Sequence, residues 1–149
     1  MGLKDIRNPF FVNMVDRNAY SLQGDITPIG VAFYIAPYVN ATIRMGSQEE
    51  KRLMFESMLT HKAYIKIPST KRGCKGQMET RVEQACRNSS NIKNRQTKAR
   101  DSALETIEEI IADNGLLNNK ILAIKLDEKM SVDRNLTGLI ANQLMAKYQ

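Results

Sequence analysis

The stretch QMETRVEQACRNSSNIKNRQTKARDSALETIEEIIAD, residues 77–113, decides the fold because it contains neither proline nor glycine. Its apolar residues recur at steps of three and four, the period of one helical face. They are Val82, Ala85, Cys86, Ala99, Ala103, Ile107, Ile110 and Ile111. Residues 87–98 are polar nearly all round, with Ile92 the only large apolar side chain. The pattern predicts one long helix with a solvated middle that bridges two packed bodies, and Asn114-Gly115 supplies its stop.

Residues 1–76 carry several helix signals in close succession. The predicted helix starts are Asn8-Pro9, Thr27-Pro28, Pro37 and the capping box Ser47-Gln48-Glu49-Glu50. In each, a side chain can cap the first turn or a proline suits its first position. Gln23-Gly24-Asp25 and Gly46 interrupt the apolar periodicity. A compact helical array is therefore expected here.

Two short segments predict a small β component. Residues 64–67 alternate like a strand, and Pro68 to Gly76 form a basic, glycine-containing loop. The run Ile121 to Leu126 is typical of a buried strand, and Asp133 or Asn135 can cap a final helix after it. A lone strand must join a sheet. We therefore expect the chain to be truncated at Gln149, with the rest of an α/β domain following.

Composition limits the class of protein. Hydrophobic residues make up 42% and charged residues 26% of the 149 positions, as in globular domains. No apolar run approaches the roughly 18 residues of a membrane span, and the start lacks the apolar region of a signal peptide. Cys74 and Cys86 do not form a zinc pattern. A reduced cysteine pair and a cytoplasmic protein without a membrane partner are expected.

Charge is distributed unevenly along the chain, whose formal net charge is +6. Residues 71–100 hold nine basic and two acidic side chains, a local charge of +7. Residues 101–128 hold seven acidic and two basic side chains, a local charge of −5. Such a change of sign indicates that one surface meets a polyanion. The alternative is a solvated helix with charges on its outer faces.

The sequence presents no set of catalytic side chains. His61 is the only histidine and is expected at the surface. Two-metal hydrolysis needs several aspartate or histidine ligands, and no Asp-x-Asp, Asp-His or His-x-Asp element occurs. Gly73 and Gly76 lack the Gly-Lys-Ser/Thr of a phosphate-binding P-loop. We therefore expect no catalytic residue and no metal ligand in this chain.

The most specific local string is IAPYVNATIRMG, residues 35–46. It resembles the "aPriNAagRmg" block of RecJ-type single-stranded-DNA exonucleases, in the DHH phosphoesterase superfamily. Ile-Ala-Pro and the pattern Asn40-Ala41-x-x-Arg44-Met45-Gly46 match. Tyr38 departs from the family, which usually has arginine or a similar polar residue there. The family commonly has two small residues where this chain has Thr42-Ile43.

Two later stretches resemble the same family in the same order. NRQTK, residues 94–98, is similar to the "LNxxRk" opening of the family's connecting helix. Ile121 to Leu126, then NLTGLIANQL at 135–144, resemble the first strand and the "GvvGivAsrl" helix of the DHH-associated domain. The resemblance implies a mainly α fragment with a small β component. Its parts would be the helical tail of a DHH catalytic domain (1–76), a long connecting helix (77–113) and a truncated DHH-associated domain (114–149).

The resemblance also implies what lies elsewhere in such a protein. The family's Asp-His-His ligands precede the matched block, and its Gly-Gly-His element follows the matched helix. The chain would then be non-catalytic alone and would link the catalytic and DNA-binding domains of a 5′-to-3′ exonuclease. The parent enzyme would require Mn or Mg and act in DNA repair and recombination.

Five residues are candidates for contact with single-stranded DNA. By resemblance, Arg44 contacts a phosphate near the cleft, and Asn40 positions that segment. Lys71, Arg72 and Lys75 form a possible phosphate-tracking loop. The alternatives are a capping or ion-paired arginine at 44 and a merely solvated loop at 71–75.

Two other functions stay open. One is a stand-alone basic helical module that binds nucleic acid through residues 71–100. The other is an oligomerisation module, in which the long helix pairs with a partner or with itself through its two apolar ends. Exposed domain-interface surfaces would allow a homo-oligomer.

Overall fold

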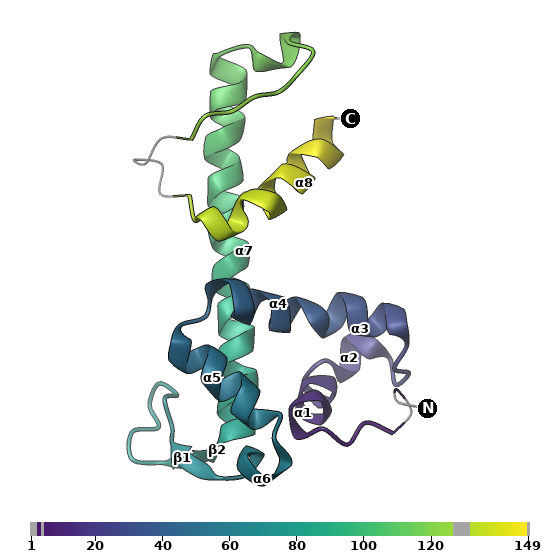
Figure 1. Cartoon of the computed structure of the whole chain (residues 1–149), viewed down its shortest axis with the longest axis vertical. Helices are drawn as coiled ribbons and strands as arrows, with labels where there is room; N and C mark the ends of the chain where they lie inside the picture. The colour runs from purple at the N-terminus through teal and green to yellow at the C-terminus, as the bar shows by residue number, and fades with distance from the viewer. Residues whose placement is uncertain (1–2, 4, 127–131, 149) are drawn as a thin grey trace. The chain divides into compact units, whose positions relative to one another are not determined.

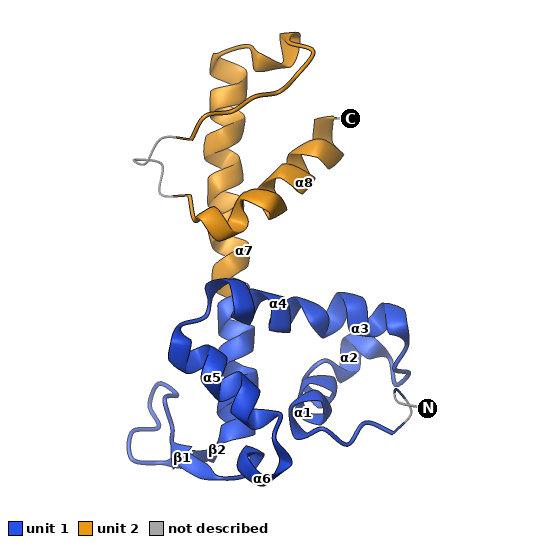
Figure 2. Cartoon of the chain, in the orientation of Figure 1, with its two compact units in different colours: residues 1–93 blue, residues 94–149 orange. Residues whose placement is uncertain are grey.

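The computed structural model describes residues 3, 5–126 and 132–148 and is mostly helical (Figure 1). Contacts group the chain into two compact units, residues 1–93 and 94–149 (Figure 2). The described elements, in chain order, are α1 (Pro9–Arg17), α2 (Ala19–Leu22), α3 (Pro28–Tyr34), α4 (Ala36–Met45), α5 (Gln48–Ser57), α6 (Thr60–Ala63), β1 (Lys66–Pro68), β2 (Met78–Thr80), α7 (Arg81–Asp113), the 3-10 turns η1 (Leu116–Asn118) and η3 (Arg134–Leu136), and α8 (Thr137–Tyr148). A mainly α protein with a small β component is therefore confirmed.

Three of the four predicted helix starts in unit 1 are confirmed by their caps, whereas α4 begins at Ala36, has no side-chain cap and holds Pro37 in its first turn. The Asn8 side chain accepts a hydrogen bond from the Phe10 amide at 3.1 Å. The Thr27 hydroxyl accepts one from the Gly30 amide at 3.0 Å. In the capping box, Ser47 and Glu50 each accept a hydrogen bond from the other's backbone N–H. Each cap satisfies amides that the first helical turn leaves without a partner.

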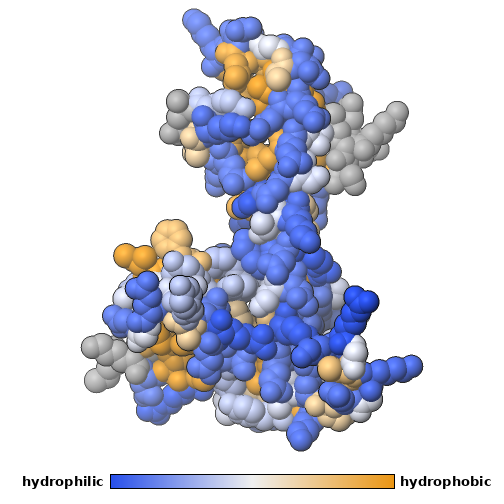
Figure 3. All heavy atoms as spheres, turned by 180° about the vertical axis from the view of Figure 1, so that it is seen from behind, coloured by the Kyte–Doolittle hydropathy of each residue, from blue (hydrophilic) through white to orange (hydrophobic). Residues whose placement is uncertain are grey.

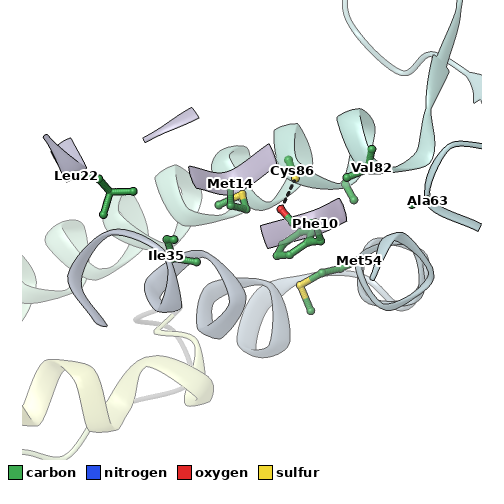
Figure 4. Packing of buried hydrophobic residues seen from close by; sticks show 9 residues of the cluster. Phe10, Met14, Leu22, Ile35, Met54, Ala63, Val82 and Cys86 are labelled. Carbon is green, nitrogen blue, oxygen red and sulfur yellow. Dashed lines mark hydrogen bonds between the residues drawn. The ribbon is translucent and has the colours of Figure 1, made fainter. Parts of the chain in front are cut away.

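The core of unit 1 gathers around α1 (Figure 4). Phe10, Met14 and Met54 are fully buried. The Cys86 thiol of α7 donates to the Phe10 carbonyl at 3.7 Å, and burial raises the pKa of that thiol to about 12. The remaining buried apolar side chains of the cluster are Leu22, Ile35, Ala63, Val82 and Ala85. Cys86 is thus a core residue and Cys74 a second free thiol, as expected for a reduced pair.

The hairpin before α7 was predicted only in part. β1 overlaps the predicted strand at Lys66 and Ile67 and also includes Pro68, which was predicted in the loop. It pairs antiparallel with β2, with Ile67 opposite Glu79. Residues 78–80 therefore form a strand, and the long helix begins at Arg81 rather than at Gln77. The reason is a cross-strand partner that helical periodicity does not reveal. Asp113 and the left-handed Gly115 (φ 58°) end the helix as predicted.

The middle of α7 is less solvated than its composition indicates. Ser89, Ile92 and Gln96 are all buried. The buried Thr42 hydroxyl lies 3.1 Å from the Ser89 hydroxyl, joining α4 to α7. The predicted wet middle is therefore wrong for this face, because hydrogen-bonded polar side chains can be buried.

Unit 2 contains the second half of α7 and α8. Residues 121–126 form no strand, so the predicted buried strand is wrong. Ile121 is 79% exposed, and Leu122, Ile124 and Leu126 line a groove of about 490 Å³ beside α8. Within the described ranges no strand lies next to this segment to complete a ladder. Asp133, one of the two predicted caps, accepts from the Asn135 amide at 2.9 Å in the turn before α8.

Among the helices that the structure describes, none is long and apolar enough to cross a membrane.

Candidate nucleic-acid interface

The loop between β1 and β2 folds as two successive turns of the same kind. The Cys74 amide donates to the Lys71 carbonyl at 3.1 Å, and the Gln77 amide donates to the Cys74 carbonyl at 3.0 Å. The third residue of each turn is a glycine with positive φ, 81° at Gly73 and 83° at Gly76. A turn in which the third residue has positive φ and the second does not is a type II turn. Glycine adopts positive φ at the least cost.

The base of this hairpin is fastened to the first turns of α7. The Arg87 guanidinium forms an ion pair with the Glu79 carboxylate, with one N–H···O distance of 2.8 Å. Arg87 and Gln84 both donate to the Thr70 hydroxyl, at 2.9 and 3.1 Å. The hydrogen bonds from Arg87 hold the pKa of Glu79 below its ordinary value. The strand ends are therefore held while the two turns project.

The cations of the loop are free, whereas neighbouring cations are paired. Lys71, Arg72 and Lys75 are exposed, and in the part of the chain that the structure describes they have no acidic partner. By contrast, Arg81 lies 3.6 Å from Glu56, and Arg87 is held by Glu79. A count of basic residues cannot make this distinction, because it depends on pairing in the fold.

Asn40 and Arg44 share one exposed face of α4, as residues four apart in a helix do. The residues that follow Asn40, Ala41 and Thr42, are buried instead. The Arg44 guanidinium has no ion pair within the described ranges. Arg44 lies in the last turn, where a cation is favoured by the helix dipole.

The backbone conformation at the end of α4 explains why the string 35–46 ends with a glycine, Gly46. A Cβ added at Gly46 would lie 2.5 Å from the Thr42 carbonyl oxygen. Tyr38, which departs from the block, donates its hydroxyl proton to the Asn18 side chain at 3.1 Å. The buried residues of the block therefore serve packing within unit 1, and its exposed residues are the candidates for binding.

The five predicted contact residues do not form one cluster. Arg44 lies just before α5, whereas the hairpin follows α5 and α6. A helix of ten residues is about 15 Å long, and Figure 1 shows α4 and the hairpin at different ends of unit 1. The structure places these residues in two separate groups. Asn40 and Arg44 lie on α4, and Lys71, Arg72 and Lys75 lie in the loop between β1 and β2.

The pocket beside the hairpin is less suited to a polyanion than the loop tip. It has a volume of about 390 Å³, and Lys71 and Cys74 contribute to its wall. Glu79 and Glu83 line it as well, so its charge is mixed.

His61 is exposed, as predicted. The Tyr64 side chain is 62% exposed and is not part of the core.

Over the described residues, no three or more histidine, cysteine, aspartate or glutamate side chains gather as metal ligands. The described residues therefore do not fit the divalent metal that the resemblance implies for the parent enzyme.

Comparison with known proteins finds two curated relatives. The chain is 36% identical over 152 aligned residues, 99% of its length, to a protein of Bacillus subtilis (strain 168) provisionally named SPbeta prophage-derived single-strand DNA-specific exonuclease YorK. It matches the protein of the same name from Bacillus phage SPbeta to the same extent. The chain spans about a quarter of the length of these relatives. No family model matches it, and no solved structure matches it significantly.

Proposed function

We propose that this chain is a segment of a RecJ-type single-strand DNA exonuclease that contacts the strand but does not carry out hydrolysis. Similarity to YorK along nearly the whole chain supports a segment of an exonuclease. The order of the matched blocks supports a position between the catalytic domain and a second, DNA-binding domain. In this proposal the Mn or Mg ligands belong to other parts of the parent protein, which is cytoplasmic.

The observation that carries the proposal is the hairpin tip. Lys71, Arg72 and Lys75 are exposed and without acidic partners among the described residues, while the strands beneath them are fastened by Arg87. Cations that no carboxylate neutralises can exchange counterions for phosphates without breaking an ion pair. Arg44 on α4 offers a second contact point for the strand.

Binding of fluorescein-labelled oligothymidine, followed by anisotropy in about 50 mM salt, tests the proposal. The wild-type chain is expected to bind with a Kd on the order of 1–100 μM at physiological salt, the range of non-specific binding, and more tightly in about 50 mM salt. Replacing Lys71, Arg72 and Lys75 together by glutamine removes up to three phosphate contacts. The slope of log K against log salt should then fall in magnitude by about 2, at about 0.7 per contact.

A matched control removes the same charge elsewhere. Lys98, Lys120 and Lys125 are exposed and have no ion pair in the described parts of the chain. Their triple glutamine variant should bind oligothymidine nearly as the wild type does. If both triple variants lose the same affinity, binding follows net charge alone, and the assignment of the hairpin is wrong.

A further inference from the structure

The β1–β2 loop repeats one arrangement twice. In each type II turn a basic residue holds the second position and a glycine the third: Arg72-Gly73 in the first turn and Lys75-Gly76 in the second. Cys74 ends the first turn and begins the second. The two cations therefore occupy equivalent corners of consecutive turns.

We propose that the two turns are a preformed clamp for two phosphates of one DNA strand, with Arg72 at one phosphate and Lys75 at the other. The proposal rests on the proposed function and states how the loop recognises its ligand. The ligand is the phosphodiester backbone, so binding is independent of base sequence. A guanidinium binds phosphate through two parallel hydrogen bonds, and an ammonium acts as a point charge.

The two turns hold their cations close together. Arg72 and Lys75 are three positions apart in the chain, so their Cα atoms are at most about 10 Å apart. This is close to the screening length of about 8 Å at physiological salt. The two charges therefore create one continuous region of positive potential.

The fold supplies the rigidity that a clamp needs. The backbone hydrogen bond from Ser69 to the Gln77 carbonyl, 2.9 Å long, closes the loop just beyond the ladder. Thr70 is held by Gln84 and Arg87 at the surface of α7. A loop that is already ordered loses less conformational entropy when it binds. Affinity should therefore depend on the turn conformation as well as on charge.

Glycine variants separate conformation from charge. A Cβ added at Gly73 or at Gly76 meets no atom within 4 Å, so alanine introduces no clash and only opposes positive φ. Alanine at both positions should lower the population of the binding-competent loop and weaken oligothymidine binding about tenfold. Asparagine, which tolerates positive φ, should keep the Kd within about twofold of the wild type. The salt slope should stay unchanged in both variants, because no cation is removed.

The ligands are oligothymidine, an abasic strand of the same length, and a duplex of that length. Equal wild-type affinity for the first two ligands, with the tenfold loss in the alanine variant, supports the clamp. If the alanine variant binds as the wild type does while the triple glutamine variant fails, the clamp is wrong and the proposed function stands.

Duplex binding as tight as single-strand binding, with the same glycine dependence, keeps the clamp and overturns the preference for single strands. A wild-type chain that binds none of the three overturns both. Thermal unfolding by circular dichroism confirms that the variants are folded.

Discussion

Unit 1 and unit 2 differ in how their buried apolar side chains are packed, although both also carry exposed apolar residues. In unit 1, Phe10, Met14 and Met54 have no exposed surface and lie at the centre of one cluster (Figure 4). In unit 2, Ile140 is buried, but apolar side chains around it line an open groove. Figure 3 shows apolar surface over both units. Most of the packing free energy is therefore expected in unit 1.

The difference also indicates where binding geometry can be held. The residues of a closed core undergo little local motion, because interiors are packed at the density of organic crystals. The hairpin is fastened to the part of α7 that belongs to this core, through Arg87 one residue after the buried Cys86. The candidate binding loop is therefore supported by the better-packed unit.

Truncating one core residue in each unit tests this comparison with the largest expected effect. Phe10→Ala should cost about 3–5 kcal/mol and Ile140→Ala about 2 kcal/mol, because a side chain beside an open groove leaves a site that can collapse. Urea unfolding followed by circular dichroism gives the loss. Hydrogen exchange measured by mass spectrometry assigns it to residues 1–93 or 94–149. A larger loss for Ile140→Ala would show that unit 2 is the better-packed unit.

The two halves of α7 provide a second comparison through their arginines. Arg87→Met should cost about 1–3 kcal/mol, because the Glu79 carboxylate, 14% exposed, loses its charged partner. Arg100 pairs with its neighbour Asp101, which is 50% exposed. Arg100→Met should therefore cost about 0–1 kcal/mol. Thermal unfolding of both variants measures the difference, and equal losses would mean that the hairpin anchor contributes no more than a surface ion pair.

Features set by local sequence were predicted, because their causes lie within a few residues. The cap at Asn8, the box at Ser47 and the stop at Gly115 each depend on side chains and backbone conformation near one helix end. The loop between the two strands was likewise predicted from its glycines and basic residues, although its predicted first residue, Pro68, lies in β1. The contact role proposed for Asn40 and Arg44 stays a prediction.

Features set by distant partners were not predicted. Residues 78–80 pair with β1 instead of joining α7, and the burial of Ser89 depends on Thr42. Residues 121–126 have the composition of a strand, but a strand also needs a neighbour for its backbone hydrogen bonds. The pairing of Arg87 with Glu79, which separates paired from unpaired cations, depends on a hairpin whose second strand was not predicted.

The two cysteines give the smallest effect and the most specific test of the unit 1 core. Because burial raises the pKa of Cys86 from 9.0 to about 12, the folded state keeps its proton at a pH where the unfolded state loses it. The stability that this thiol contributes is therefore complete below pH 9 and is lost as the pH rises toward 12. At pH 10 the expected loss is about 1.4 kcal/mol, one pH unit above the unfolded pKa.

Urea unfolding at pH 8 and pH 10 measures this loss, with Cys86→Ala and Cys74→Ala as the matched pair. Both variants lack one thiol, but only Cys86 contacts the Phe10 carbonyl and lies in the core. Cys74→Ala should keep the wild-type loss of stability at pH 10, and Cys86→Ala should lose that part of the pH dependence. If the two variants show the same pH dependence, the Cys86 thiol is accessible to water in the folded state, and the unit 1 core is less closed than its burial indicates.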